Sequence, residues 1–284
     1  MPAVTVVVPT FARPERLAAC LAALAAQTMR DFAVIVVDDG SDPPVRGVVE
    51  AARGFADGQL RYLRQDNAGP AAARNRGAGA ADGPWLAFTD DDCRPRPDWL
   101  AALAAAAEAA PGALLGGHTV NGEVGNLFSE ASQDLIGFLE AEDRAYFASN
   151  NLACPADGFA GLGGFAESFP LAGGEDRDFG LRWGAAGRPV AHVADAVVDH
   201  HHALDPRGFW RQHANYGRGA RHMRGRNAAV AEGAAHRFAR LGWYARLVSW
   251  PVRTRQPKGL RRAGLLAAAQ VATAWGFVTP PGPK

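Results

Sequence analysis

The chain has few cysteines, no leader-like N-terminus and no long apolar run. Its three cysteines (Cys20, Cys93 and Cys154) are far apart and include no CxxC pair, so neither a disulfide framework nor a zinc site is indicated. The sequence enters a strand-like run of valines at residue 4, and we therefore expect no signal peptide. The apolar stretch at residues 264–278 is shorter than the ~20 residues that a membrane-spanning helix needs.

What is present is a globular composition with alternating elements. The 284 residues are 48% hydrophobic and 21% charged, which suits one large core or an α/β domain with a smaller appendage. We predict strands at residues 4–8, 33–37, 60–63, 84–89, 149–153 and 190–198, helices that begin at residues 14, 44, 67, 98 and 174, some helix within 121–148, and a Gly-rich loop at 158–174. This order indicates an α/β fold, with a mostly parallel sheet flanked by helices on both faces.

Three consecutive carboxylates, Asp90, Asp91 and Asp92, follow the apolar run at residues 84–89. Delivering bare carboxylates at the end of a buried strand costs free energy, which favours a functional role. Side chains alternate along an extended backbone, so we expect Asp90 and Asp92 to point to the same side and to share one divalent cation. The alternative is a solvated acidic turn.

A second predicted strand also ends in carboxylates, Asp38 and Asp39, followed by Gly40 and Ser41. Ligands of open α/β sheets bind beyond the carboxyl ends of the parallel strands. Two acidic strand ends at that edge predict one polar cleft. A tight turn that caps the next helix is the alternative, because Asp, Gly and Ser are ordinary turn residues.

Three further segments carry candidate functional groups. Residues 67–75 begin a predicted helix after Gly69 and offer N–H groups to a phosphate, although ordinary capping is the simpler interpretation of this segment alone. Glu175 and Asp176 open a helix, where either is a candidate general base and where the helix dipole also favours acidic residues. Among the three histidines after the last predicted strand, His200 is the candidate metal ligand.

Taken in order, these segments resemble the family 2 glycosyltransferases with the GT-A fold. The resemblance covers about residues 3–220 and runs through residues 6–11, 36–41, 67–77, 88–93, 163–165, 174–176 and 216–219. At Phe11 and Ala12 the chain departs from many relatives, which carry Tyr and Asn there. That change keeps stacking on the base but loses contacts through a hydroxyl.

The resemblance implies a set of donor-binding residues. They are Pro9, Thr10, Phe11, Asp39, Arg74, Asn75, Asp90 and Asp91. Pro9, Thr10 and Phe11 correspond to the loop beside the nucleotide base, and Asp39 to the acidic residue that accepts a hydrogen bond from the base.

The resemblance also implies a metal site and a catalytic base. Asp90 and Asp92 correspond to the DxD pair, with Asp92 as the direct ligand of Mn2+ or Mg2+. His200 resembles a metal-binding histidine that only some GT-A enzymes have. Asp176 corresponds to the base of the inverting members, with Glu175 beside it as the alternative carboxylate.

The implied reaction is metal-dependent transfer of a sugar from a nucleotide-diphosphate sugar to a hydroxyl acceptor, with inversion, in the synthesis of a bacterial cell-envelope polysaccharide. UDP is the favoured nucleotide, with guanine and thymine as the alternative bases, while the sugar, the acceptor and the linkage stay open. We expect the GT-A catalytic domain at residues 1–204, with a nucleotide-binding half at about 1–118 and an acceptor half at about 119–204. An Arg-rich helical extension is expected at residues 205–284.

Charge is divided unevenly between these two parts. Residues 1–204 hold 15 basic and 27 acidic residues, whereas residues 205–284 hold 15 basic and two acidic ones. The basic extension is expected either to dock on the acidic body or to meet anionic phospholipid. Trp275 near the end of the apolar stretch and Arg261 before it are typical of an interfacial helix. We thus expect a cytoplasmic protein, peripheral at the inner face of the plasma membrane, with a glycan or lipid-linked acceptor and no nucleic-acid partner.

Two other functions use similar features. A sugar-1-phosphate nucleotidyltransferase also holds Mg2+ on carboxylates of an α/β sheet, but it needs a Gly-rich basic loop after the first strand, and residues 11–14 contain no glycine. Release of pyrophosphate from a nucleoside triphosphate would identify it. A non-catalytic module that binds sugar nucleotides is the other candidate, and the presence of every required acidic residue disfavours it.

Overall fold

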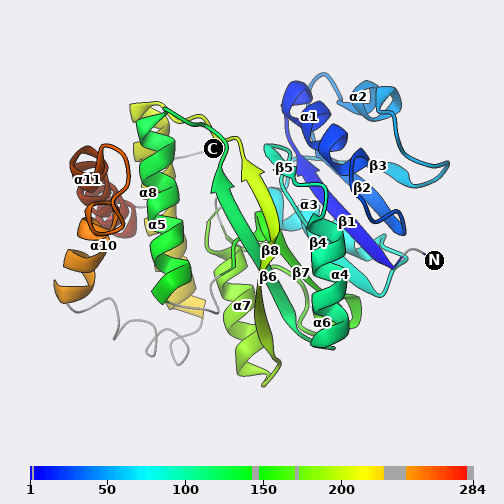
Figure 1. Cartoon of the computed structure of the whole chain (residues 1–284). Coiled ribbons are helices and arrows are strands. Elements are labelled where there is room, and N and C mark those ends of the chain that lie inside the picture. The colour runs from blue at the N-terminus through cyan, green and yellow to red at the C-terminus, as the bar shows by residue number, and fades with distance from the viewer. Residues whose placement is uncertain (2, 143–146, 170–172, 227–240, 280–284) are drawn as a thin grey trace. The chain divides into compact units, whose positions relative to one another are not determined.

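The structure is a computed structural model that describes residues 1, 3–142, 147–169, 173–226 and 241–279 (Figure 1). The chain divides into two compact units. The first comprises Met1–Val120, Arg144–Glu167 and Asp176–His201, and the second comprises Asn121–Asp143, Ser168–Glu175 and His202–Lys284. The expected division into a nucleotide-binding half, an acceptor half and an extension is functional, and it stays a prediction.

A sheet with the strand order β3-β2-β1-β4-β7-β6-β8-β5 forms the centre of the first unit. Its strands are β1 (Val4–Thr10), β2 (Phe32–Asp39), β3 (Leu60–Gln65), β4 (Trp85–Phe88), β5 (Cys93–Pro95), β6 (Leu114–Asn121), β7 (Leu152–Pro155) and β8 (Val190–His200). β1 pairs in parallel with β2 and β4, and β2 with β3. β7 runs antiparallel to β4 and β6, as does β5 to β8. The predicted α/β class is confirmed.

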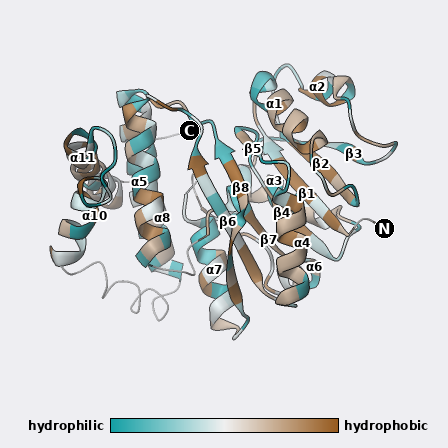
Figure 2. Cartoon of the chain, viewed as in Figure 1, coloured by the Kyte–Doolittle hydropathy of each residue, from teal (hydrophilic) through white to brown (hydrophobic). Residues whose placement is uncertain are grey.

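Helices cover both faces of this sheet. They are α1 (Pro14–Ala25), α2 (Arg46–Ala51), α3 (Pro70–Gly79), α4 (Trp99–Ala109), α6 (Ala156–Gly161) and α7 (Glu175–Ala185). Side chains alternate along β1, so Val6 and Val8 pack in one core with Leu17 of α1, while Val7 packs in a second core with Phe179 of α7. Figure 2 shows the hydrophobic residues concentrated along the strands. Full burial of one such Val or Leu side chain contributes about 1.5–3 kcal/mol.

The elements differ from the sequence prediction in a few places. The predicted strand at residues 149–153 begins as a 3-10 turn, Ser149–Asn151, and only then becomes β7. Helix α6 extends into the first residues of the predicted Gly-rich loop, because Phe159 packs in the core there. Residues 170–172 of this loop, and residues 143–146 of the predicted helical stretch, lie outside the described residues.

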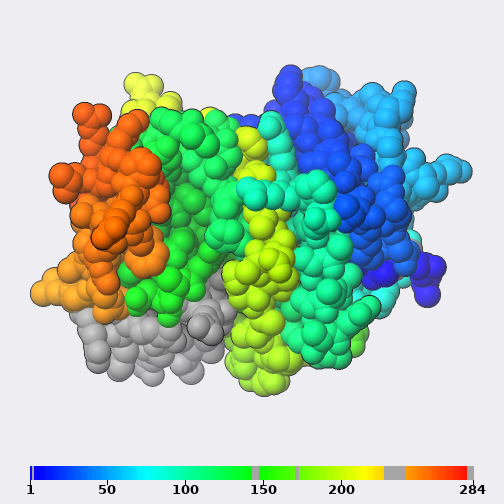
Figure 3. All heavy atoms as spheres, in the orientation of Figure 1, coloured from blue at the N-terminus to red at the C-terminus, as the bar shows by residue number. Residues whose placement is uncertain are grey.

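The second unit is helical. It contains α5 (Leu127–Glu142), α8 (Pro206–Arg226), α10 (Leu241–Arg253) and α11 (Gly259–Val278). The atoms of α10 and α11 are coloured orange in Figure 3. α8 and α11 cross in contact: a Cβ on Gly217 would collide with the carbonyl of Thr273, and one on Gly276 with the carbonyl of Ala214. No helix within the described ranges is both long and apolar enough to cross a bilayer.

A buried ion pair joins two helices of this unit. Arg262 of α11 donates to both carboxylate oxygens of Asp134 of α5, at 2.6 Å each. Such bidentate pairs are among the stronger hydrogen-bonded contacts in proteins. The expected helical C-terminal extension is therefore attached to α5 by charge as well as by apolar packing.

His213 of α8 is an imidazole buried among aromatic rings. Its ring centroid lies 4.4 Å from that of Phe209 and 5.5 Å from that of Tyr216. Burial lowers the pKa of His213 from 6.5 to about 4. The folded chain therefore keeps this ring neutral at pH values where an exposed histidine is charged.

We expect His213 to make the protein sensitive to acid. Its pKa is lower in the folded than in the unfolded state, so falling pH protonates the unfolded state first and lowers the free energy of unfolding. This loss should reach roughly 3 kcal/mol between pH 7 and pH 4. Denaturant titrations across that range should show that His213→Leu removes this part of the pH dependence. His192→Leu, at an exposed site of β8, should keep it; the same slope in both variants would contradict the expectation.

Candidate active site

The ends of several strands lie side by side at one edge of the sheet. β1 and β2 stay in register up to Thr10 and Asp38, and β4 lies beside β1 and ends at Phe88. β7 runs antiparallel to β4, with Leu152 opposite Phe88. The turn Ser149–Asn151 that leads into β7 therefore lies at the same edge. This is the edge at which ligands of open α/β sheets bind.

Asp38 stabilises the loop that follows β2. Its carboxylate accepts hydrogen bonds from the N–H groups of Ser41 and Val45 and from the hydroxyl of Tyr62, at 2.9, 3.2 and 2.6 Å. Burial raises the pKa of Asp38, but these hydrogen bonds outweigh burial, and the net shift is downward. For Asp38, the tight-turn interpretation agrees with the structure.

Asp39 holds the start of α3. Its Oδ1 accepts hydrogen bonds from the side chain of Gln65 at 2.7 Å and from the N–H of Ala68 at 2.9 Å, and its Oδ2 accepts one from the N–H of Gly69 at 2.8 Å. Gly69 has a φ of 93°, a conformation that glycine adopts readily. Asp39 thus fixes the loop before α3 at the sheet edge.

The loop after β1 exposes an aromatic ring. Pro9 and Thr10 are buried at the end of β1, whereas the side chain of Phe11 is exposed. Ala12 has a φ of 52°, and its N–H donates to the hydroxyl of Ser41 at 2.8 Å. The predicted base-side loop is therefore attached to the loop that follows Asp38.

The three aspartates form a turn rather than an extended strand. β4 ends at Phe88, and the N–H of Cys93 donates to the carbonyl of Asp90 at 3.0 Å, which closes a four-residue turn. The expectation that Asp90 and Asp92 alternate along an extended backbone is wrong, because the chain reverses there towards β5. Asp90 pairs with the buried guanidinium of Arg74 at 2.6 Å.

Two arginines that the sequence analysis did not single out bind the other carboxylates. Arg13 lies 3.1 Å from Asp91 and 3.2 Å from Asp92, and Arg16 lies 3.1 Å from Asp92. Thr10 donates to Asp91 at 2.7 Å. Burial and the charge of Asp92 raise the pKa of Asp91 to about 6, against the lowering effect of Arg13. The sequence feature that could have indicated these ion pairs is the presence of two arginines, three residues apart, at the start of α1.

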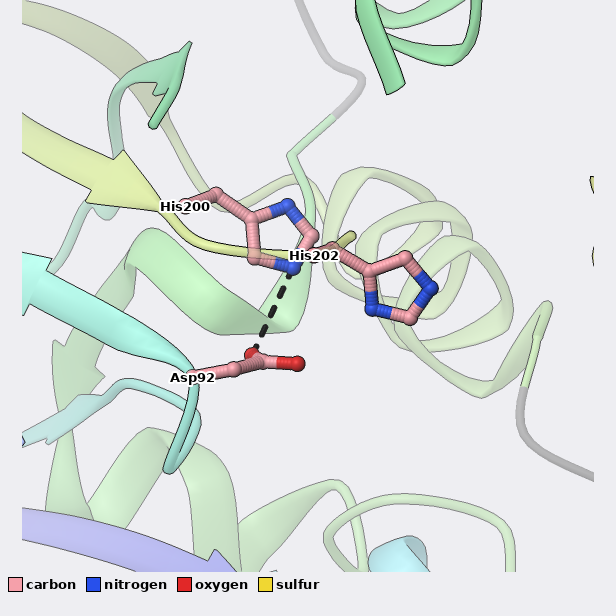
Figure 4. A group of neighbouring side chains, drawn as sticks. All are labelled: Asp92, His200 and His202. Carbon is pink, nitrogen blue, oxygen red and sulfur yellow. Dashed lines mark ion pairs between the residues drawn. The ribbon is translucent and has the colours of Figure 1, made fainter. Parts of the chain in front are cut away.

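Asp92 and His200 face each other across a strand pair (Figure 4). β5 and β8 pair with Cys93 opposite His200, which brings Nε2 of His200 to 3.4 Å from a carboxylate oxygen of Asp92. Burial lowers the pKa of His200, but the hydrogen bond and charge of Asp92 outweigh burial and raise it. His202, also drawn in Figure 4, is the first residue of the last segment of the second unit.

The Asp92–His200 pair fits a divalent cation. Adjacent ligands of an octahedral ion with bonds of ~2.1 Å are about 3 Å apart, close to the 3.4 Å observed. A carboxylate with an imidazole suits a transition metal such as Mn2+ better than Mg2+, which prefers oxygen ligands alone. Asp90, predicted as a second carboxylate ligand, is paired with Arg74, and its role as a metal ligand stays a prediction.

Asp176 reaches the same sheet edge from the first turn of α7. Its Oδ2 accepts a hydrogen bond from the N–H of Ser149 at 3.3 Å, and its Oδ1 one from the N–H of Arg177 at 2.7 Å. Glu175 is buried, and its carboxylate accepts a hydrogen bond from the N–H of Gly173 at 2.8 Å. Of the two candidate bases, Asp176 is the one bonded to the turn beside the end of β4.

The sequence model of the family described as glycosyl transferase family 2 matches residues 5–162, more than half of the chain. The chain belongs to glycosyl transferase family 2. It is 32% identical over 227 residues to the validoxylamine A glucosyltransferase of Streptomyces hygroscopicus subsp. jinggangensis (strain 5008), an alignment that covers 67% of this chain and 53% of that protein. The chain thus spans about half the length of the curated relatives it matches.

Solved structures share the fold of this family 2 chain. The mannosyltransferase PcManGT from Pyrobaculum calidifontis, in complex with GDP-Man and Mn2+, matches with a TM-score of 0.65 and 21% identity over 96% of this chain and 87% of that one. S. aureus TarS 1-349 in complex with UDP matches with a TM-score of 0.59 and 18% identity over 98% and 89%. The predicted GT-A fold is confirmed.

In this family 2 chain, Asn75 of α3 binds a backbone segment. Its amide donates to the carbonyl of Phe165 at 2.8 Å and accepts from the N–H of the same residue at 2.9 Å, and it also donates to Glu167 at 2.8 Å. A donor-binding role for Asn75 stays a prediction, whereas its contact with Phe165 ties α3 to the segment after α6.

Asn75→Ala should lower the free energy of unfolding by about 1–3 kcal/mol, because two backbone groups of Phe165 lose their partner. The measurement is denaturant unfolding of the full chain. Arg76→Ala, at the exposed neighbouring position of α3, is the matched control and should change stability by less than about 0.5 kcal/mol. Equal losses in both variants would rule out the structural role of Asn75.

Proposed function

We propose that the protein is a glycosyltransferase that moves a sugar from a nucleotide-diphosphate sugar, with UDP as the favoured nucleotide, to a hydroxyl acceptor. The observation that supports this most is the gathering of Asp39, Asp92 and Asp176 at the ends of β2 and β4 and beside the turn into β7. Membership of glycosyl transferase family 2 supports the same reaction class.

The donor site that we propose uses residues at the ends of β1 and β2, in α3 and in the turn after β4. The exposed ring of Phe11 stacks on the base, and Asp39 keeps one lone pair, on Oδ2, to accept a hydrogen bond from the base while it holds the loop before α3. Pro9 and Thr10 shape this loop, and Arg74 with Asn75, Asp90 and Asp91 line the sugar-diphosphate side. Two structural neighbours were solved with nucleotides, GDP-Man and UDP, which supports a nucleotide donor.

We propose that Asp92 and His200 hold Mn2+ or Mg2+, with Asp90 as a further carboxylate. When bound, such an ion stabilises the negative charge that develops on the leaving diphosphate. Arg13 and Arg16 pair with the Oδ2 of Asp92. Their positive charges offset the charge of this carboxylate, and their guanidinium groups lie where a diphosphate would meet positive charge.

The catalytic base that we propose is Asp176. The acceptor hydroxyl gives its proton to the carboxylate of Asp176 while its oxygen bonds to the anomeric carbon. The bond between that carbon and the diphosphate breaks on the opposite face, and the nucleoside diphosphate leaves with the electron pair. A single displacement of this kind inverts the anomeric centre. General-base assistance is worth about 10²–10⁴-fold in rate.

Donor and metal should stabilise the protein together. In thermal-shift measurements with UDP-, GDP- and dTDP-sugars, we expect one donor to raise Tm by several degrees only when Mn2+ is present, since a ligand at 100 times its Kd adds about 2.7 kcal/mol. Asp92→Ala should abolish that metal-dependent part. Asp82→Ala, which removes an exposed carboxylate paired with Arg61, should retain it. A donor shift that is the same without metal would contradict the metal assignment.

Asp176→Asn should separate chemistry from binding. We expect a loss of about 10²–10⁴-fold in kcat, with donor-dependent stabilisation unchanged and, in the wild type, an inverted product by NMR. Glu175→Gln is the comparison variant and should keep most of the rate. If Asp176→Asn worked at a near-normal rate while Glu175→Gln did not, the base would be Glu175.

We also propose the acceptor and the place of action. The acceptor is a glycan or a lipid-linked saccharide of the cell envelope, and the protein works in the cytoplasm at the inner face of the plasma membrane. The basic helices after residue 205 support contact with anionic lipid. Vesicles that carry a lipid-linked acceptor should be glycosylated faster than the same acceptor in detergent micelles.

A further inference from the structure

Helix α11 is apolar on two opposite faces. Its inner face, with Leu266, Ala269 and Ala272, is buried against the other helices of the second unit. Its outer residues fall within about 100° of one another at the helical angle per residue. They are exposed or small throughout: Leu260, Gly264, Ala267, Val271, Ala274, Trp275 and Val278, called here the α11 stripe.

The α11 stripe is unusual for a surface helix, whose outer face is normally polar. Val271 is 61% and Trp275 54% exposed. The helix spans 20 residues, or about 30 Å. A contiguous exposed apolar strip of this length marks an interaction surface.

Positive charge lies at one end of the stripe. The segment from residue 241 to residue 279 contains no Asp or Glu. Its Arg246 pairs with Glu142, and Arg262 pairs with Asp134. Four further cations (Arg253, Arg255, Lys258 and Arg261), called here the basic connection, are exposed between α10 and the first turn of α11. No carboxylate of the described residues lies in ion-pair distance of these four.

The backbone of the basic connection is held in a costly conformation. Arg255 and Lys258 have φ values of 55° and 56°, in the left-handed region that Gly and Asn adopt more readily. Strained residues of this kind gather at functional sites. The chain keeps long cationic side chains at two positions where Gly or Asn would fold more easily.

We propose that the α11 stripe and the basic connection dock the protein on an anionic phospholipid bilayer. The apolar stripe enters the boundary between headgroups and acyl chains, with α11 parallel to the membrane plane, as amphipathic anchors do. The four cations meet the phosphate groups at one end of the helix. Each such cation near an anionic surface contributes about fivefold to partitioning. This surface shares no residue with the proposed donor site, and its test needs no donor.

Vesicle flotation of the full chain tests the proposal. We expect binding to vesicles of equal phosphatidylglycerol and phosphatidylcholine, and weak binding to pure phosphatidylcholine. The double variant Arg255→Asn with Lys258→Asn should weaken partitioning about 30-fold, from the loss of two charges. Because Asn suits the left-handed backbone, this variant should unfold at the same temperature as the wild type or higher. Weaker binding by this variant would therefore not be caused by unfolding.

Two further variants test the apolar part. Val271→Asn combined with Trp275→Ser should weaken binding at least about tenfold. Trp210→Ser, which removes a 42% exposed tryptophan of α8, is the matched control and should bind as the wild type does. Equal binding to neutral and anionic vesicles, or unchanged binding in either double variant, overturns the proposal. So does light scattering that shows a dimer dissociated by Val271→Asn, since the stripe would then cover a second copy.

Discussion

Mutual repulsion among carboxylates that share one sheet edge is the constraint on which the site depends. Asp90, Asp91 and Asp92 are consecutive in a tight turn, so their charges cannot separate. The chain neutralises them with guanidinium groups from two helices: Arg74 of α3 binds Asp90, and the arginines at the start of α1 bind the others. Even so, the pKa of Asp91 rises to about 6. Removing Arg13 would leave the buried carboxylate of Asp91 without its guanidinium partner.

This neutralisation also connects elements that are distant in sequence. Arg13 follows β1, Arg74 lies in α3 and His200 ends β8, and all three contact the turn after β4. Asp39 extends the same network, because its carboxylate holds the loop that leads into α3. The residues proposed for the donor and the metal are therefore linked by one set of polar contacts, whereas the proposed base, Asp176, is held separately by the N–H groups of Ser149 and Arg177.

The sequence predicts the fold well wherever the spacing of apolar side chains distinguishes a strand from a helix. Valines at successive positions of β1 belong to two cores, which explains why a continuous apolar run predicts a strand covered on both faces. The acidic ends of β2 and β4 are predictable for the same reason, whereas the role of Asp176 follows from the family resemblance and stays a prediction. The turn at Asp90 is not predictable, because a short polar run has no spacing of apolar residues that distinguishes a turn from an extended strand.

Contacts that depend on tertiary pairing lie beyond sequence reasoning. The ion pairs of Arg13 and Arg16 join residues more than 70 positions from their partners. His200 was a candidate ligand from its place after a strand, but its proximity to Asp92 follows from the pairing of β5 with β8. The sequence suggests a donor contact for Asn75, but it does not reveal the bonds of Asn75 to the backbone of Phe165, because these depend on how the segment after α6 folds back onto α3.

The glycines at the crossing of α8 and α11 have a consequence for orientation. Backbone touches backbone at Gly217 and Gly276, so α11 cannot slide or turn by one residue without driving a Cβ into a carbonyl. One residue of rotation is about 100°, which would swing Trp275 from the outside of the bundle to its flank. The rotation of α11 about its own axis is therefore fixed by the absence of a side chain at Gly217 and Gly276, not by the side chains on its exposed face.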